Sequence, residues 1–297
     1  MKKLTKENLE SMVRQVIEDL PGKIYDNFII YDLATATLRH YLGDEWTNQN
    51  ASAFFEPKVL KGNGKGRNFL RTGDPIAENH FRHQLRVMQL AELMFNLQGV
   101  DGIEERIEKI KQGALESFYG ELECAAQIKK ANLPFRFVIP SGNRGKDYDI
   151  EIMLSSGGKL NCEMEVTTEE KDLRQSTILN KLKGAKKQLP KEQPGMIFLK
   201  IPESWPKQSD AQTILNESLN KFLGDTNRVI AVVLRWEELI VDLSILRPAV
   251  LKIFFRIEAN TSSKFYSPEI ENILWQINNP LLKDWIRFPD IVKQMSI

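Results

Sequence analysis

The sequence DYDIEIMLSSGGKLNCEMEV, residues 147–166, contains two strand-like runs on either side of a Ser-Ser-Gly-Gly turn. Apolar and polar residues alternate in both runs, as they do in half-buried strands. Alternate side chains of a strand share a face, so Glu163 and Glu165 are expected together, opposite the apolar residues that face a core. The segment therefore predicts a β-hairpin with an acidic face.

The first run repeats this pattern. Asp147, Asp149 and Glu151 alternate with apolar residues, so pairing of the two runs would bring two acidic faces together. Like charges directly opposite each other on a ladder are destabilising, and a bound divalent cation would remove that repulsion. The alternative is a solvated sheet face that is acidic without holding a ligand.

A helix predicted over residues 115–131 adds a further carboxylate. Its apolar stripe includes Phe118, Leu122 and Ile128, and Glu121 stands beside that stripe. A carboxylate on an apolar helix face is expensive unless it is paired or binds a metal, so Glu121 is the stronger candidate. Glu123 is the fallback, because its side of the helix is expected to face solvent. A salt bridge at the edge of the stripe is the alternative explanation for Glu121.

Working outward, the sequence predicts helices at 115–131, 176–189 and 211–223 and strands at 135–139, 148–154, 159–167, 196–201 and 229–236. This order favours an α/β (α+β) fold with a central mixed sheet flanked by helices. Other expected elements are helices at 5–20, 26–43, 76–98 and 103–110, an irregular segment at 44–75, a strand at 250–257 and a last helix after Pro280. We expect a mostly helical N-terminal region over 1–112, an α/β core over 113–260 and a C-terminal extension over 261–297 that packs on the core.

The composition is that of a globular protein, with 42% hydrophobic and 27% charged residues among 297. The net charge of +1 neither favours nor excludes a nucleic-acid partner, because a local basic surface is sufficient. The two cysteines form no C-x-x-C pair, which excludes a zinc ribbon or a thioredoxin-like motif. No stretch resembles a signal peptide or a transmembrane helix, so we expect no membrane contact and a cytoplasmic location.

Residues 116–201 resemble the PD-(D/E)XK nuclease superfamily, which has the restriction-endonuclease-like fold. The resemblance is carried by Glu121 in Gly120-Glu121-Leu122-Glu123, by Asp149 in Lys146-Asp147-Tyr148-Asp149-Ile150, and by Glu163-Met164-Glu165. The helix is also similar to the first helix of archaeal Holliday-junction resolvases. The resemblance implies a core of helix, three or four strands and helix, with a divalent metal on Asp149 and Glu163. The family usually has lysine where this chain has Glu165, so this would be an E-x-E variant.

The chemistry of these residue types agrees with that implication. Mg²⁺ (or Mn²⁺) on Asp149 and Glu163 would lower the pKa of a bound water and clamp phosphate oxygens, as phosphodiester hydrolysis requires. Glu121 would orient a metal-bound water or bind a second metal. Glu165 would be a ligand or accept the proton of the nucleophile.

Basic residues are concentrated just after the second acidic strand, from residue 171 to 191. On the predicted 176–189 helix, Lys181 and Gln188 flank the apolar stripe, and either can reach the edge of the site. Lys181 would supply the charge that the missing family lysine provides. The residues expected to contact DNA are Lys181, Lys187, Gln188, Arg144 and Lys146. A solvated helix face is the alternative for each lysine taken alone.

The leading hypothesis is a Mg²⁺-dependent DNA endonuclease of restriction or repair type. The second is a catalytically degenerate member of the fold that binds DNA or a protein partner, which Glu165 in place of lysine favours. The third is a structural or interaction protein with an acidic sheet face. Because many nucleases of this fold act as dimers, a homodimer is an expected assembly, although the sequence does not indicate which surface would form the dimer interface.

Overall fold

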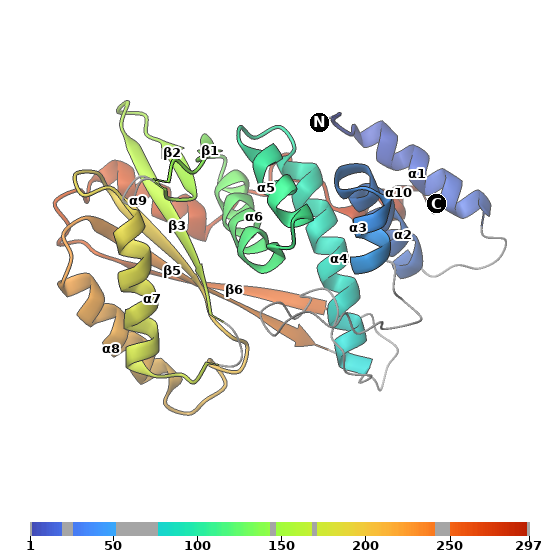
Figure 1. Cartoon of the computed structure of the whole chain (residues 1–297). Helices are drawn as coiled ribbons and strands as arrows, with labels where there is room; N and C mark the ends of the chain where they lie inside the picture. The colour runs from blue at the N-terminus through green and yellow to red at the C-terminus, as the bar shows by residue number, and fades with distance from the viewer. Residues whose placement is uncertain are drawn as a thin grey trace.

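A computed structural model of the chain describes residues 2–19, 26–51, 77–142, 147–167, 171–240 and 250–295. These residues form a mixed α/β fold with ten helices and a six-stranded sheet (Figure 1). The helices are α1 (Lys6–Asp19), α2 (Asp26–Leu42), α3 (Asp44–Asn50), α4 (Ala77–Leu97), α5 (Ile103–Lys111), α6 (Leu115–Lys130), α7 (Gln175–Gln188), α8 (Ala211–Gly224), α9 (Pro268–Asn278) and α10 (Phe288–Met295). The strands are β1 (Phe135–Phe137), β2 (Ile150–Met153), β3 (Lys159–Val166), β4 (Gly195–Lys200), β5 (Val229–Ile240) and β6 (Val250–Ala259).

The sheet follows the chain, with strand order β1-β2-β3-β4-β5-β6. β1 pairs antiparallel with β2, and β2 pairs antiparallel with β3. β3, β4 and β5 pair parallel, because α7 and α8 provide the crossovers that parallel neighbours need. β6 returns antiparallel to β5. The predicted mixed sheet is therefore confirmed.

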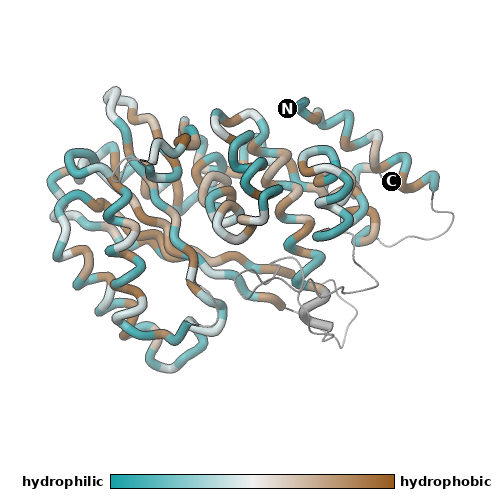
Figure 2. The backbone as a smooth tube through the Cα atoms, in the orientation of Figure 1, coloured by the Kyte–Doolittle hydropathy of each residue, from teal (hydrophilic) through white to brown (hydrophobic). Residues whose placement is uncertain are grey.

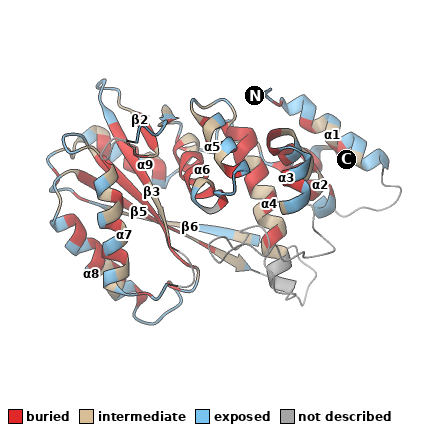
Figure 3. Cartoon of the chain, in the orientation of Figure 1, coloured by how far each residue is buried: buried red, intermediate tan, exposed pale blue. Residues whose placement is uncertain are grey.

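Helices cover both faces of the sheet, as the sequence predicted. Cys162 and Phe198 pack with α6 and the N-terminal helices in one core. Ile197 and Leu199, on alternate positions, pack with α7 and α8 in a second core. The central strands are accordingly the most continuously apolar and buried part of the molecule (Figures 2 and 3).

The N-terminal region is helical, as predicted, and it is not packed separately from the sheet. Side chains of α1, α2 and α4 belong to the same buried cluster as α6 and one face of the sheet. α10 packs against α1 and α2, which brings the two ends of the chain to one side of the molecule (Figure 1). The proposed boundaries near residues 112 and 260 stay predictions.

Two helices differ from the sequence prediction. α3 occupies part of the segment expected to be irregular. α9 was not predicted, although Ser267 caps it by accepting a hydrogen bond from the Ile270 amide at 3.3 Å and Pro268 occupies its first turn. α10 corresponds to the last helix expected after Pro280. None of the helices in the described ranges is both long and apolar enough to span a membrane.

Candidate functional site

Asp149 lies directly before β2, close to Glu163 of β3. The ladder of the hairpin begins at the pair Ile150–Cys162, and the Asp149 amide donates to the same Cys162 carbonyl at 3.1 Å, so Asp149 lies beside the first pair of the ladder. Oδ2 of Asp149 accepts a hydrogen bond from the Met164 amide at 2.7 Å. The predicted strand over 148–154 thus begins two residues later, and the backbone of β3 positions the Asp149 carboxylate.

Of these carboxylates, Glu163 has the surroundings that most disfavour a negative charge. It is only 7% exposed, and its buried Oε2 atom has no hydrogen-bond partner among the residues that the structure describes. Burial first, and then the negative charges of Asp149 and Glu165, raise its pKa to about 10. Burial also raises the pKa of Asp149, to about 6, although the Met164 amide opposes that shift. A cation bound here would satisfy the orphaned oxygen and remove the repulsion.

Glu121 joins this pair from α6. A Cβ atom at Gly120 would lie 3.0 Å from Cγ2 of Val166 and 3.1 Å from Cε of Met164, so glycine allows α6 to pack closely on β3. The next residue, Glu121, is buried. Its burial, and then the negative charge of Asp149, raise its pKa to about 8. The structure therefore brings Glu121, Asp149 and Glu163 into one electrostatically coupled cluster.

Arg106 of α5 is the site residue that sequence reasoning missed. It is 2% exposed, its Nε donates to Oε2 of Glu121 at 3.0 Å, and an Nη donates to the Asp149 carbonyl at 3.2 Å. Its guanidinium also lies over the ring of Phe137, 5.1 Å from the centroid. The available signal was an arginine on the same helix face as Ile103 and Ile107. The N-terminal helical region thus contributes a cation to the cluster.

Glu165 lies at the exposed side of the same cluster and is paired with Lys181 of α7. Nζ of Lys181 is 3.0 Å from Oε2 of Glu165, and the two side chains are 36% and 24% exposed. A Cβ atom at Gly184 would approach Oε1 of Glu165 to 3.5 Å, so the helix surface also packs against this carboxylate. Among the predicted DNA-contact residues that the structure describes, Lys181 is the one that binds a carboxylate of the cluster.

The remaining acidic residues of the hairpin do not join the cluster. Glu151 pairs with Asn161 across the ladder and binds Arg136 and Lys159, at 3.0 and 3.1 Å. Tyr148, expected on the apolar face of the strand, instead donates to Glu151 at 2.8 Å. Asp147 accepts hydrogen bonds from the amide and hydroxyl of Ser141. The expected continuous acidic face is therefore divided by basic neighbours.

The other predicted DNA contacts have different positions. Lys187 is exposed on α7, and Gln188 is partly buried at its last turn. Arg144 and Lys146 lie outside the described residues. Lys186, also on α7, donates to the Asp225 carbonyl at 3.2 Å and so caps the end of α8. The exposed residues of α7 offer phosphate contacts on the helix that carries Lys181.

The carboxylates of the cluster are the candidate ligands for a metal ion. Within the described ranges, no group of three or more His, Cys, Asp or Glu side chains is arranged to hold a metal ion. Arg106 and Lys181 already bind two of the four carboxylates. Asp149 and Glu163 remain, with hard oxygen donors, one of them unpartnered. A site of two carboxylates suits Mg²⁺, which usually keeps several waters and takes its other ligands from substrate phosphates.

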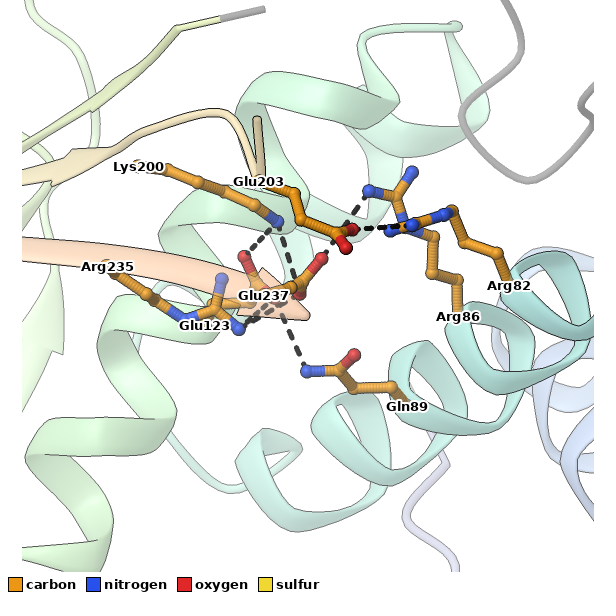
Figure 4. A network of polar contacts seen from close by, with 8 residues as sticks. All are labelled: Arg82, Arg86, Gln89, Glu123, Lys200, Glu203, Arg235 and Glu237. Atoms are coloured by element: carbon orange, nitrogen blue, oxygen red, sulfur yellow. Dashed lines mark hydrogen bonds and ion pairs between the residues drawn. The ribbon is translucent and has the colours of Figure 1, made fainter. Parts of the chain in front are cut away.

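Glu123 does not face solvent, which corrects the sequence prediction: it is 3% exposed. The prediction was wrong because Gly120 and Gln127 gave that side of α6 a polar pattern, whereas Gly120 packs on β3 and Gln127 is buried. Glu123 belongs to a buried charge network that joins α4 and α6 to β4, β5 and the loop after β4 (Figure 4). Its members are Arg82, Arg86, Gln89, Glu123, Lys200, Glu203, Arg235 and Glu237.

Two cations are shared by two glutamates at the centre of this network. Nζ of Lys200 is 2.8 Å from Glu123 and 3.3 Å from Glu237, and Arg235 also binds both glutamates. Burial raises the pKa of Glu123 to about 7, although Arg235 and Lys200 oppose it. At Glu237 the two cations outweigh burial and hold the pKa well below its usual range. Arg86 of α4 reaches Glu237 at 3.4 Å, so the network fastens α4 to the sheet.

Two surface cavities lie away from both charged clusters. One, of about 930 Å³, is lined by residues such as Lys186, Asp225 and Arg228 at the ends of α7 and α8. The other, of about 460 Å³, lies between the 155–158 turn and α9. Comparison of the chain with protein-family models, with curated proteins and with solved structures returned no match. The site is therefore interpreted from its own chemistry.

Proposed function

We propose that the protein is a metal-dependent DNA endonuclease whose divalent cation, Mg²⁺ or Mn²⁺, binds to Asp149 and Glu163. The observation that carries the proposal is the buried Oε2 atom of Glu163, which finds no hydrogen-bond partner in the described part of the chain and lies near the charges of other carboxylates. A buried polar atom without a partner costs free energy, and a buried carboxylate among like charges costs more. A hard cation is the ligand that removes both costs.

The charge balance supports one divalent cation in this cluster. Glu121, Asp149, Glu163 and Glu165 would carry four negative charges when ionised, and Arg106 and Lys181 carry two positive charges. The remaining two negative charges equal the charge of one divalent ion. Because Arg106 already binds the Glu121 carboxylate, Glu121 would orient the attacking water and would not hold the cation itself.

The bound cation would activate a water molecule and neutralise charge on the scissile phosphate. Asp149 and Glu163 would hold it, with the Met164 amide fixing the orientation of Asp149. Glu165, the most exposed carboxylate of the cluster, would accept the proton of the attacking water. Lys181 would place its ammonium beside the phosphate, as the lysine of the usual family pattern does. Lys187 would add a contact to the DNA backbone.

The order of elements also supports membership of the PD-(D/E)XK superfamily. The chain runs α6, β1, β2, β3, α7, β4, which is the helix, strands and helix that the resemblance implies. Asp149 and the Glu163-Met164-Glu165 segment lie on neighbouring strands, and Glu121 lies on the preceding helix. The departure at Glu165 is accompanied by a lysine 3.0 Å away on α7.

One observation favours a second candidate, a degenerate nuclease fold that binds DNA or a protein partner without cutting. Arg106 and Lys181 neutralise two carboxylates without any metal, as side chains do in a cluster that has lost its cation. This candidate and the leading one differ in metal binding and in cleavage.

The test measures both properties on the same preparations. Titration calorimetry with Mg²⁺ and Mn²⁺ is compared for the natural chain, Asp149→Asn, Glu163→Gln and the control Glu217→Gln, an exposed glutamate on α8. Cleavage is assayed on supercoiled, linear, branched and single-stranded DNA with each metal.

We expect one cation per chain and metal-dependent cutting in the natural protein and in Glu217→Gln, with both lost in the two site variants. Metal binding without cleavage of any substrate, together with DNA binding, would favour the degenerate candidate. No metal binding at millimolar concentration would contradict the proposed site.

A further inference from the structure

β6 is an edge strand with an open side. In the part of the chain that the structure describes, it pairs with β5 along ten residues and has no strand on its other side. Val250 is 47% exposed, Ile253 is 38% exposed, and Lys252 is exposed between them. Together with β5, the strand extends past the other strands of the sheet toward α4 (Figure 1). A long edge with exposed apolar residues is a template for pairing with another strand.

The backbone of β6 has a defined outward set of hydrogen-bonding groups. The β5–β6 register is unbroken from Ala231–Ala259 to Ile240–Val250, and the Asn260 amide, next along, donates to the Ile230 carbonyl at 2.8 Å. In an antiparallel ladder, hydrogen-bonded and non-hydrogen-bonded pairs alternate. Even-numbered residues of β6 therefore bond to β5, and the N–H and C=O groups of the odd-numbered residues point outward.

A twofold pairing of β6 with itself, centred on Phe255, uses these outward groups. It places odd residues opposite odd residues, so that Ile253 faces Ile257 of the second copy in a hydrogen-bonded pair. The same register places Lys252 opposite Glu258 of the second copy, in a non-hydrogen-bonded pair, where side chains approach most closely. By symmetry this charge pair occurs twice.

The charges select this register over its neighbours. Moving the twofold centre to Phe254 would put Lys252 opposite Arg256 of the second copy, and moving it to Arg256 would put the two Arg256 side chains opposite each other, so both shifts pair like charges. Centring it on Ile253 would shorten the overlap and put Lys252 opposite Phe254. A lysine on an edge strand normally protects that edge from pairing. Lys252 lies opposite Glu238 of β5, and Glu258 of a second copy would bring a second carboxylate to its open side. Glu258 accepts from Arg256 at 2.9 Å and retains acceptor capacity for a second cation.

We propose that two copies of this chain associate through β6, antiparallel and centred on Phe255, so that their sheets form one continuous sheet. The occupant of the open edge is therefore the same strand of a second copy, with Lys252 and Glu258 as the reciprocal charge pair. This edge of the sheet does not include the carboxylate cluster, so dimerisation and nuclease activity can be tested independently.

The test is a charge-swap series followed by sedimentation equilibrium of the full chain. Lys252→Glu and Glu258→Lys each turn both reciprocal pairs into like-charged pairs, so each variant alone should dimerise about tenfold more weakly or not at all. Mixing the two variants restores opposite charges at both pairs, so the mixture should form a heterodimer. The double variant should again form a homodimer. Lys221→Glu and Glu217→Lys, exposed on α8, are the matched controls and should behave like the natural chain.

Three results would overturn the proposal. The natural chain would be monomeric at the highest concentration tested. The dimer would persist unchanged in both single variants, which would place the interface elsewhere. The mixture of single variants would remain monomeric although each sediments as a folded monomer with the far-ultraviolet circular dichroism of the natural chain.

Discussion

Lys181 and Glu165 form an ion pair 3.0 Å long between α7 and β3, at the exposed side of a cluster of buried carboxylates. Glu165 lies where the PD-(D/E)XK nucleases that the sequence resembles usually have lysine, and Lys181 of this chain approaches the same carboxylate from α7. A positive charge is thus present at the site although the strand supplies a carboxylate. The pair is the feature that most directly connects the sequence pattern to the proposed chemistry.

Replacing Lys181 tests whether that ammonium acts in cleavage. Lys181→Met should lower kcat on the order of 10²-fold, because a positioned cation beside the reacting phosphate is lost. Metal affinity should change little, since the proposed ligands are Asp149 and Glu163 and not Lys181. Lys183→Met is the matched control, because it removes an exposed charge from the same helix and should affect mainly KM. Equal effects of the two variants on kcat would contradict the role of Lys181.

Removing either metal ligand should abolish activity while the fold is retained. Asp149→Ala and Glu163→Ala should each reduce metal-dependent cutting about 10²-fold or more, and each should weaken metal binding. Circular dichroism and thermal unfolding check the fold, which should stay intact because each substitution also relieves repulsion among the carboxylates. Full activity in Asp149→Ala would show that the cation site has been placed wrongly.

The raised pKa of Glu163 predicts how the stability of the metal-free protein depends on pH. Its folded pKa of about 10 lies above its ordinary value of 4.5, so the folded chain keeps a proton that the unfolded chain releases. The free energy of unfolding should therefore fall as the pH rises from about 4.5 toward 10. Glu163→Gln should remove this contribution and stabilise the protein at pH 8 by on the order of 1–3 kcal/mol.

Urea unfolding in EDTA at several pH values between 5 and 8 makes this measurement. The difference in unfolding free energy between Glu163→Gln and the natural chain should be smaller near pH 5 than near pH 8. Near pH 5 a larger fraction of the unfolded natural chain carries a proton on Glu163. Glu217→Gln, which changes an exposed glutamate, should show no such trend. A difference between Glu163→Gln and the natural chain that is constant with pH would exclude an unusual pKa for Glu163.

The buried charge network predicts a large effect from a single uncharged substitution. Lys200→Met leaves Glu123 and Glu237 with one shared cation fewer in a buried environment, which should cost about 3–5 kcal/mol. Lys207→Met is the control, because Lys207 is 56% exposed where it binds Glu203, and its loss should cost about 1 kcal/mol or less. Equal effects in urea unfolding would contradict a large contribution of the buried network to stability.

Local pattern was sufficient to predict most of the elements. The alternation over residues 159–166 and the apolar stripes of α6 and α7 predicted their secondary structure. The hairpin then constrained its own register, because a slip of one residue would move every side chain to the other face. Pairing of the two strands brings Asp149 near Glu163, and the resemblance to the PD-(D/E)XK superfamily named these two residues as the candidate metal pair.

Packing between distant segments determined the rest. Arg106 reaches Glu121 from another helix, and Arg86 reaches Glu237 from 151 residues away. Gly120 looked like part of a polar helix face, although it lies against β3 because it has no side chain. A local period reports which residues share a face, but it does not report what that face meets. The ion pairs that neutralise buried carboxylates depend on how whole elements dock, so they become visible only once the chain is folded.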